Sequence, residues 1–151
     1  MVAHARLERR ADSLSQLRAL LESRTETLVL FSQLAGFRPF QPRLEVQHLL
    51  QDFCESLVDY TASAHFQLYR FIEDGTERRS NMQEIAEVIY PRIISFTQQI
   101  LVFNDKYEND ANCKDLSSLD GDLSALGELL AERIQEEDKL ITMFAETEFR
   151  S

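Results

Sequence analysis

The chain has 151 residues, of which 44% are hydrophobic and only four are Gly and three Pro. This length suffices for one domain with a core that needs no disulfide or metal, and the composition excludes a disordered or low-complexity chain. The formal net charge of −10 is uneven, +2 over residues 1–45, −4 over residues 46–102 and −8 over residues 103–151, which disfavours nucleic acid and anionic membrane and favours a basic partner.

The first predicted helix runs from about Leu7 to Ala35, because apolar residues recur there at intervals of three and four. The stripe expected to face the core consists of Leu7, Ala11, Leu14, Leu17, Leu21, Thr25, Leu28, Phe31 and Ala35. Gly36 suits a left-handed C-cap, and the prolines up to Pro42 do not continue a helix. The N-terminus has no apolar leader and no run approaches a membrane span, so we expect a cytoplasmic protein.

The second predicted helix, residues 46–72, contains no Gly and no Pro and has two distinct faces. Its core stripe consists of Val46, Leu50, Phe53, Leu57, Tyr60, Ala64, Leu68 and Phe71. The opposite face consists of Glu55, Val58, Asp59, Ala62, Phe66, Tyr69 and Glu73. Two aromatic residues among three carboxylates are unusual for a solvated face, so we expect another helix or another protein to cover it.

The third predicted helix follows a connection in which Gly75 ends the second helix, and it runs from Met82 to about Asp105. Its core positions are Met82, Ile85, Ile89, Ile93, Phe96, Ile100 and Phe103. Pro91 removes a backbone hydrogen bond, so we expect a kink there. Residues 104–122 are polar and form the one long connection, with residues 106–118 expected to be mobile.

The fourth predicted helix starts between Leu119 and Leu123 and runs to about Glu148. Its core positions are Leu123, Leu126, Leu130, Ile134, Ile141 and Phe144. A further core position falls on Glu137 or Asp138, where charge is unexpected. Three interpretations are open: an acidic edge that binds a partner, side chains that extend toward the solvent at the end of the bundle, or an internal pairing with an arginine such as Arg24.

Four amphipathic segments of this length predict an all-α protein, an up-down-up-down four-helix bundle with long helices and a kinked third helix. We expect a single helical domain over residues 1–151.

Catalytic or metal chemistry has little support in the sequence. The one Glu-x-x-His match is Glu45 with His48, and a di-metal bundle needs two such pairs, so we expect no metal and no cofactor. His65 suggests a histidine phosphotransfer module as an alternative function, but the Lys and Gly that such modules place after the histidine are missing. A hydrogen bond from His65 to a neighbouring helix is the simpler interpretation. No nucleophile has a base at motif spacing, so we do not expect an enzyme.

An interaction protein is the remaining class. Glu55 and Asp59 lie one turn apart on the outward face of the second helix, and Phe66 and Tyr69 flank them as candidate anchors. The carboxylates suit Arg or Lys of a partner. Acidity that only keeps the protein soluble is the open alternative.

Residues 52–60, DFCESLVDY, and residues 64–66, AHF, resemble the signature of the regulator of sigma D (Rsd) and AlgQ family of bacterial anti-sigma factors. The likeness extends to LAG at residues 34–36, IYPR at residues 89–92, FND at residues 103–105 and EDKLI at residues 137–141. Two departures are the sequence Ala62-Ser63-Ala64, where the family commonly has Ser-Ala-Gly, and the absence of Trp.

The resemblance implies a helical bundle that binds the C-terminal helix-turn-helix domain of the primary sigma factor. Binding would limit the association of that domain with core RNA polymerase and with −35 promoter DNA, without direct contact to nucleic acid or membrane. The motif acid of the family falls on Asp59, its neighbours on Phe53, Ser56 and His65, and the late acidic pair on Glu137 and Asp138. The expected partner-binding residues are Glu55, Ser56, Asp59, His65, Phe66, Tyr69, Glu137 and Asp138.

Overall fold

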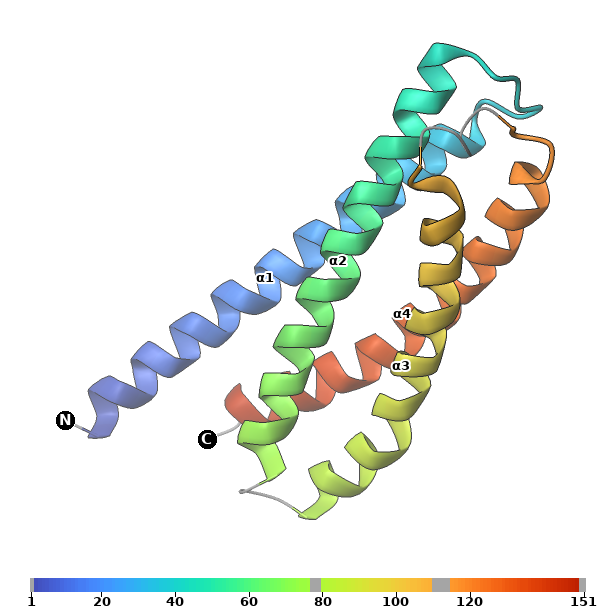
Figure 1. Ribbon diagram of the computed structural model, residues 1–151. Coiled ribbons are helices and arrows are strands. Elements are labelled where there is room, and N and C mark those ends of the chain that lie inside the picture. The colour runs from blue at the N-terminus through green and yellow to red at the C-terminus, as the bar shows by residue number, and fades with distance from the viewer. Residues whose placement is uncertain (1, 77–79, 110–114, 150–151) are drawn as a thin grey trace.

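The computed structural model describes the backbone of residues 2–76, 80–109 and 115–149, and the side chains of residues 15–68, 87–109 and 115–143. It contains four helices, α1 (Val2–Ala35), α2 (Leu44–Thr76), α3 (Ser80–Tyr107) and α4 (Leu119–Phe149), and no strand in the described ranges. Successive helices run in opposite directions (Figure 1), which confirms the predicted four-helix bundle. The main helix pairs are α1 with α2, α2 with α3, and α3 with α4, whereas α1 and α4 touch much less.

None of these helices, over the described residues, is both long enough and apolar enough to cross a membrane.

The end of α1 lies at Ala35 as predicted, but Gly36 does not adopt the expected left-handed conformation. The N–H of Gly36 donates to the carbonyl of Ser32 at 3.1 Å, and the N–H of Phe37 donates to the carbonyl of Leu34 at 3.0 Å. These bonds tighten the last turn and satisfy the terminal carbonyls, so no left-handed residue is required.

The two later connections are shorter than predicted. α2 passes through Gly75 and ends at Thr76, and α3 extends to Tyr107. The hydroxyl of Tyr107 donates to Asp122 at 2.5 Å, which fastens the end of α3 to the first turn of α4. Of the segment expected to be mobile, residues 106 and 107 are helical, Leu116 is buried, and residues 110–114 lie outside the described residues.

Pro91 lies inside α3 without ending it. Figure 1 shows the axis of α3 changing direction in its N-terminal half, the half that contains Pro91, in agreement with the predicted kink.

The described core consists of two apolar clusters stacked along the bundle. One includes Phe53, which packs edge-on against Phe31 and Phe103 with ring centroids 5.9 and 6.0 Å apart. The other is built around Tyr60 and Leu68 of α2. All described members of the predicted α2 stripe are buried, namely Val46, Leu50, Phe53, Leu57, Tyr60, Ala64 and Leu68. The period of α2 was therefore predicted correctly.

The predicted inward stripe of α1 is wrong by a partial rotation of the helix. Leu20, Thr27 and Leu34 are fully buried, whereas Leu28 is 37% exposed and Thr25 is exposed. Thr27 tolerates burial because its hydroxyl bonds to the carbonyl of Ser23 at 3.0 Å. Because α1 packs mainly on α2, the leucine-rich flank that faces α4 is only partly covered.

The predicted inward positions of α4 need one change. Leu123, Leu126, Leu130 and Ile141 are buried as predicted, but Ile134 is half-buried and Arg133 is fully buried in its place. The inward stripe passes through residues 126, 130, 133, 137 and 140, so two charged residues take core positions between the apolar clusters.

Candidate functional site

The outward face of α2 is open to solvent. Glu55, Asp59, Ala62 and Phe66 are exposed, and the side chain of Phe66 is 64% exposed. No helix of the described bundle covers this face, which leaves another protein as the predicted cover. The side chain of Tyr69 lies outside the described residues.

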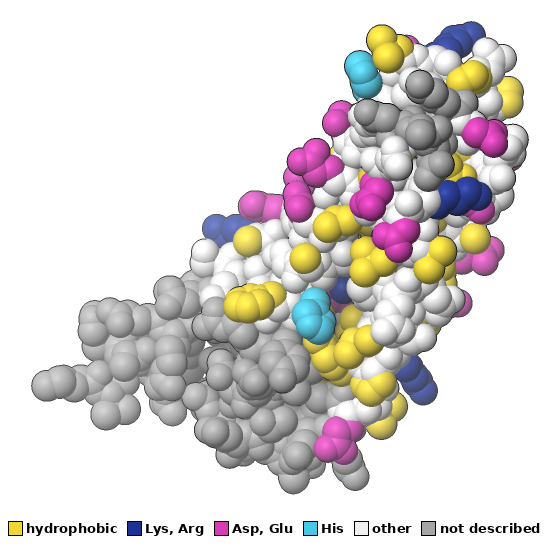
Figure 2. Space-filling view, in the orientation of Figure 1, with side chains coloured by type: hydrophobic (Ala, Val, Ile, Leu, Met, Phe, Trp, Pro, Cys, Tyr) yellow, Lys and Arg dark blue, Asp and Glu magenta, His cyan; other side chains and the backbone are white. Residues whose placement is uncertain are grey.

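The charge of this face has one sign. Between Leu44 and Leu68 the sequence of α2 contains four acids and no Lys or Arg. Glu55 and Asp59 form no ion pair within the described residues. Figure 2 shows acidic side chains along the upper half of the molecule, where α2 lies in front. An exposed acidic helix face with an aromatic residue at one end suits a partner that offers cations around an apolar pocket.

α1 extends this acidic face, which the sequence did not reveal. Thr27 of α1 and Ser56 of α2 hold the two helices together, with their hydroxyl oxygens 2.8 Å apart. Because α1 and α2 run in opposite directions from this contact, Asp59, three residues beyond Ser56, lies at a level between Glu22 and Glu26 of α1. Glu26 and Glu22 are both exposed. The misassigned rotation of α1 concealed them, although their spacing of four residues is visible in the sequence.

Ser56 therefore has a structural role. It is only half-exposed, and its hydroxyl and carbonyl oxygens both lie within hydrogen-bonding distance of Thr27. Its contribution to the outward face is to fix how α1 sits beside Asp59.

Glu137 lies in the interior, at the centre of a polar network. Its Oε1 accepts hydrogen bonds from the hydroxyl of Tyr60 at 2.6 Å and from Nη1 of Arg24 at 3.2 Å, and its Oε2 accepts from Nη1 of Arg133 at 2.5 Å. Both Glu137 and Arg133 are fully buried. Of the three interpretations of this acid, the structure supports internal pairing, including the pairing with Arg24. Glu137 does not reach the surface.

The network joins all four helices. Arg133 of α4 also donates from Nε to the hydroxyl of Thr97 on α3 at 2.9 Å, and its guanidinium lies 5.2 Å from the centre of the Tyr60 ring. Burial and the charge of Glu137 raise the pKa of Tyr60, so its hydroxyl stays protonated as a donor. The buried charges form a layer between the two apolar clusters, and the hydrogen bonds of Glu137 and Arg133 tie α4 to each of the other three helices.

Asp138 is the surface end of this network. Its side chain is 53% exposed, and its Oδ1 accepts a hydrogen bond from Arg24 Nη1 at 2.6 Å. Burial alone lowers the pKa of Arg24, but the bond to Asp138 and the charges of Asp138 and Glu137 outweigh it and raise that pKa. The late acidic pair is therefore split, with one carboxylate inside the bundle and one at its surface between α1 and α4.

His65 is exposed on the flank of α2 that faces α3. Its Nδ1 lies 2.8 Å from the hydroxyl of Tyr90, and the two rings stack with centroids 5.9 Å apart. This contact matches the interpretation that His65 bonds to a neighbouring helix. His65 borders the outward face without pointing along it.

Metal-ligating side chains do not cluster over the part of the chain that the structure describes. Glu45 and His48, the one Glu-x-x-His match, are both exposed near the start of α2.

Comparison with known proteins gives a consistent result. The family model described as "Regulator of RNA polymerase sigma(70) subunit, Rsd/AlgQ" matches residues 2–145. The chain is 33% identical over 134 residues to the regulator of sigma D of Yersinia enterocolitica, covering 84% of this chain and 78% of that protein. It is 34% identical to the regulator of sigma D of Yersinia pestis bv. Antiqua over the same shares, and 30% identical to that of Pectobacterium carotovorum, covering 82% of this chain and 83% of the relative. No solved structure matches significantly.

Proposed function

The chain belongs to the Rsd/AlgQ family of regulators of the RNA polymerase sigma(70) subunit, and from this premise we propose that it is an anti-sigma factor. It binds the C-terminal domain of the primary sigma factor and keeps that domain from core RNA polymerase and from −35 promoter DNA. It acts by binding alone, without a catalytic step or a cofactor.

The observation that carries this proposal is the exposure of the Asp59 carboxylate on α2. This carboxylate has no ion pair within the described residues, and it lies on a helix face without Lys or Arg. A helix-turn-helix domain that reads promoter DNA presents cationic residues to phosphates. An acidic face that pairs with the same cations competes directly with DNA.

The surrounding residues contribute in different ways. Glu55 supplies a second charge one turn from Asp59, and Phe66 supplies exposed aromatic area for a pocket on the partner. His65 borders the same face and belongs to the proposed contact, and Tyr69 belongs to it by its spacing from Phe66 in the sequence. Ser56 and Glu137 act from inside, because they hold α1 and α4 in place around the contact.

The test is isothermal titration calorimetry of the whole chain against the sigma(70) subunit and against its isolated C-terminal domain. We expect one-to-one binding to both, with an affinity that falls as salt is raised from about 50 to 300 mM, because exposed charges are screened over roughly 10 Å. The chain should bind a preformed complex of sigma with core polymerase more weakly than free sigma, because core polymerase competes for the same domain. Binding to the full subunit without any binding to its C-terminal domain contradicts the proposed contact.

A further inference from the structure

A groove runs beside α1 on its exposed flank. It has a volume of about 580 Å³, and the described residues that line it are Leu17, Arg18, Leu21, Glu22, Thr25 and Glu26. Leu17, Leu21 and Thr25 follow one another at intervals of four and form its floor. The hydroxyl of Thr25 already bonds to the carbonyl of Leu21 at 2.9 Å, so Thr25 offers the groove mainly its methyl group.

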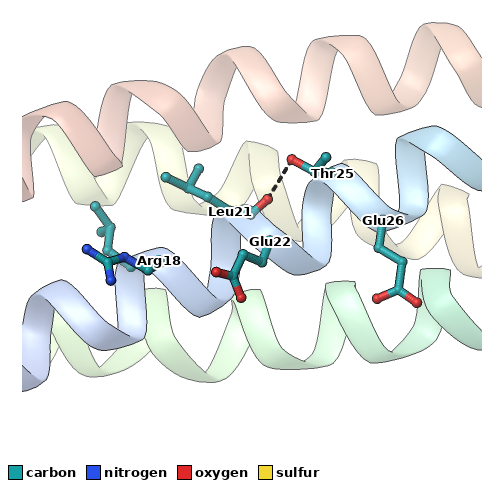
Figure 3. Close-up of a pocket in the computed structure, with 6 residues that line it drawn as sticks. Arg18, Leu21, Glu22, Thr25 and Glu26 are labelled. Atoms are coloured by element: carbon teal, nitrogen blue, oxygen red, sulfur yellow. Dashed lines mark hydrogen bonds between the residues drawn. The ribbon is translucent and has the colours of Figure 1, made fainter.

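The edges of this groove differ in chemistry. Figure 3 shows Leu21 and Thr25 on the side of α1 toward α4, and Glu22 and Glu26 on the side toward α2. Neither Glu22 nor Glu26 forms an ion pair within the described residues. The described lining is thus apolar on the α4 side and acidic on the α2 side, with Arg18 as the one cation among these residues, and the acidic edge faces the helix that carries Asp59.

We propose that this groove receives an amphipathic helix of the bound sigma factor, whose apolar side lies on Leu17, Leu21 and Thr25 while its basic residues pair with Glu22 and Glu26. This inference rests on the proposed function, because it extends the contact from α2 across α1. The apolar floor spans eight residues, about 12 Å of helix, which matches two turns of a docked helix. Apolar anchors spaced by four in a groove are the usual way in which one helix recognises another.

Charge complementarity selects a basic helix of the partner. The chain has a net charge of −10, so a second copy of it has the same excess of negative charge as the edge formed by Glu22 and Glu26. A DNA-reading domain has the opposite charge and places cations on helices. The acidic edge lies on the side of α1 toward α2, the helix that carries Asp59, so the proposed contact spans two neighbouring helices.

The test uses two variants, each with a matched control, and calorimetry against the C-terminal domain of sigma(70). Glu22→Gln combined with Glu26→Gln removes the acidic edge. Its control is Glu128→Gln combined with Glu132→Gln, an exposed pair with the same spacing on α4. Thr25→Arg fills the groove at an exposed position.

The control for the filled groove is Ser95→Arg, which adds the same charge at an exposed position of α3. We expect the double Gln variant to bind about 2- to 30-fold more weakly at low salt, with a shallower salt dependence, because two ion pairs of about 0.2–1 kcal/mol each are lost. Thr25→Arg should weaken binding at least as much, and both controls should bind like the wild type. Equal thermal melting of the variants and the wild type shows that the fold is intact.

Three outcomes overturn the inference. If the wild type binds the domain and both groove variants bind equally well, the groove is not part of the contact, whereas the proposed function stands. If the wild type does not bind the domain, the proposed function fails together with the inference. If sedimentation shows a concentration-dependent dimer that Thr25→Arg abolishes, a second copy occupies the groove instead.

Discussion

Replacement of Glu137 by Leu tests whether the buried polar layer holds the bundle together. The change removes one carboxylate that accepts hydrogen bonds from Tyr60, Arg24 and Arg133. Of the two arginines, Arg24 loses less, because it keeps the bond to Asp138 and its side chain is 17% exposed. Arg133 is left fully buried, and its remaining hydrogen-bond partners among the described residues are the hydroxyls of Thr97 and Tyr60.

The expected loss follows from this uncompensated charge. Removal of one partner of a buried ion pair costs about 3–5 kcal/mol, a large share of the roughly 5–15 kcal/mol by which a domain of this size is stable. The combined replacement Tyr60→Phe, Arg133→Met and Glu137→Leu removes the stranded charge and the stranded hydroxyl together. Because apolar residues of similar size can replace a buried ion pair, this triple variant should regain most of the loss.

The assay is urea denaturation followed by circular dichroism at 222 nm, with Glu132→Leu as the control on the exposed face of α4. The control should change the free energy of unfolding by less than about 0.5 kcal/mol. A loss below about 1 kcal/mol for Glu137→Leu refutes the assignment of Glu137 as the centre of the network. A triple variant no more stable than the single variant refutes the explanation by a stranded charge.

Two glycines and one acid give further predictions. Gly127→Ala places a methyl group 2.9 Å from Cζ of Phe31, so the close contact of α1 with α4 must shift and the midpoint of thermal unfolding should fall. The methyl group of Gly121→Ala meets no atom within 4 Å, so the higher helix propensity of Ala should stabilise the fold by up to about 1 kcal/mol and raise that midpoint. Equal effects of the two changes on the midpoint contradict the close contact between Gly127 and Phe31. Burial alone raises the pKa of Asp122, but bonds from Lys106 and Tyr107 lower it below the ordinary value of 3.8. This stabilisation is complete above pH 3.8 and is lost as the pH falls through the lowered pKa, so the stability difference between wild type and Asp122→Asn should shrink between about pH 5 and pH 2. A stability difference that does not change with pH contradicts the lowered pKa of Asp122.

The fold could be predicted from the sequence because its elements are long and strongly periodic. In α2 the apolar residues alternate at intervals of four and three from Val46 to Leu68, so the buried face and the exposed face were both assigned correctly. In α1 the buried stripe includes Thr27, whose burial depends on bonds to Ser23 and Ser56. A hydrophobicity pattern does not contain such bonds, so the predicted stripe followed Leu28 and was rotated.

The candidate site was predictable where it lies on one helix and not where it depends on two. Asp59 and Phe66 share a face by spacing alone, and the structure leaves that face open. Glu137 occupies an inward position, and the sequence left open whether it pairs inside or binds outside. Only the meeting of α1, α2 and α4 decides this, because the pairing residues are 113 positions apart for Arg24 and 77 apart for Tyr60.

The most direct measurement of the central claim is the affinity of the Asp59→Ala variant for the C-terminal domain of sigma(70), with Glu132→Ala as the exposed control on α4. If Asp59 meets a cation of the partner in a contact that excludes water, Asp59→Ala should weaken binding by about 1–3 kcal/mol, roughly 5- to 150-fold, and Glu132→Ala should have no effect. Equal affinities of the wild type and Asp59→Ala would show that the outward face of α2 does not bind the sigma factor.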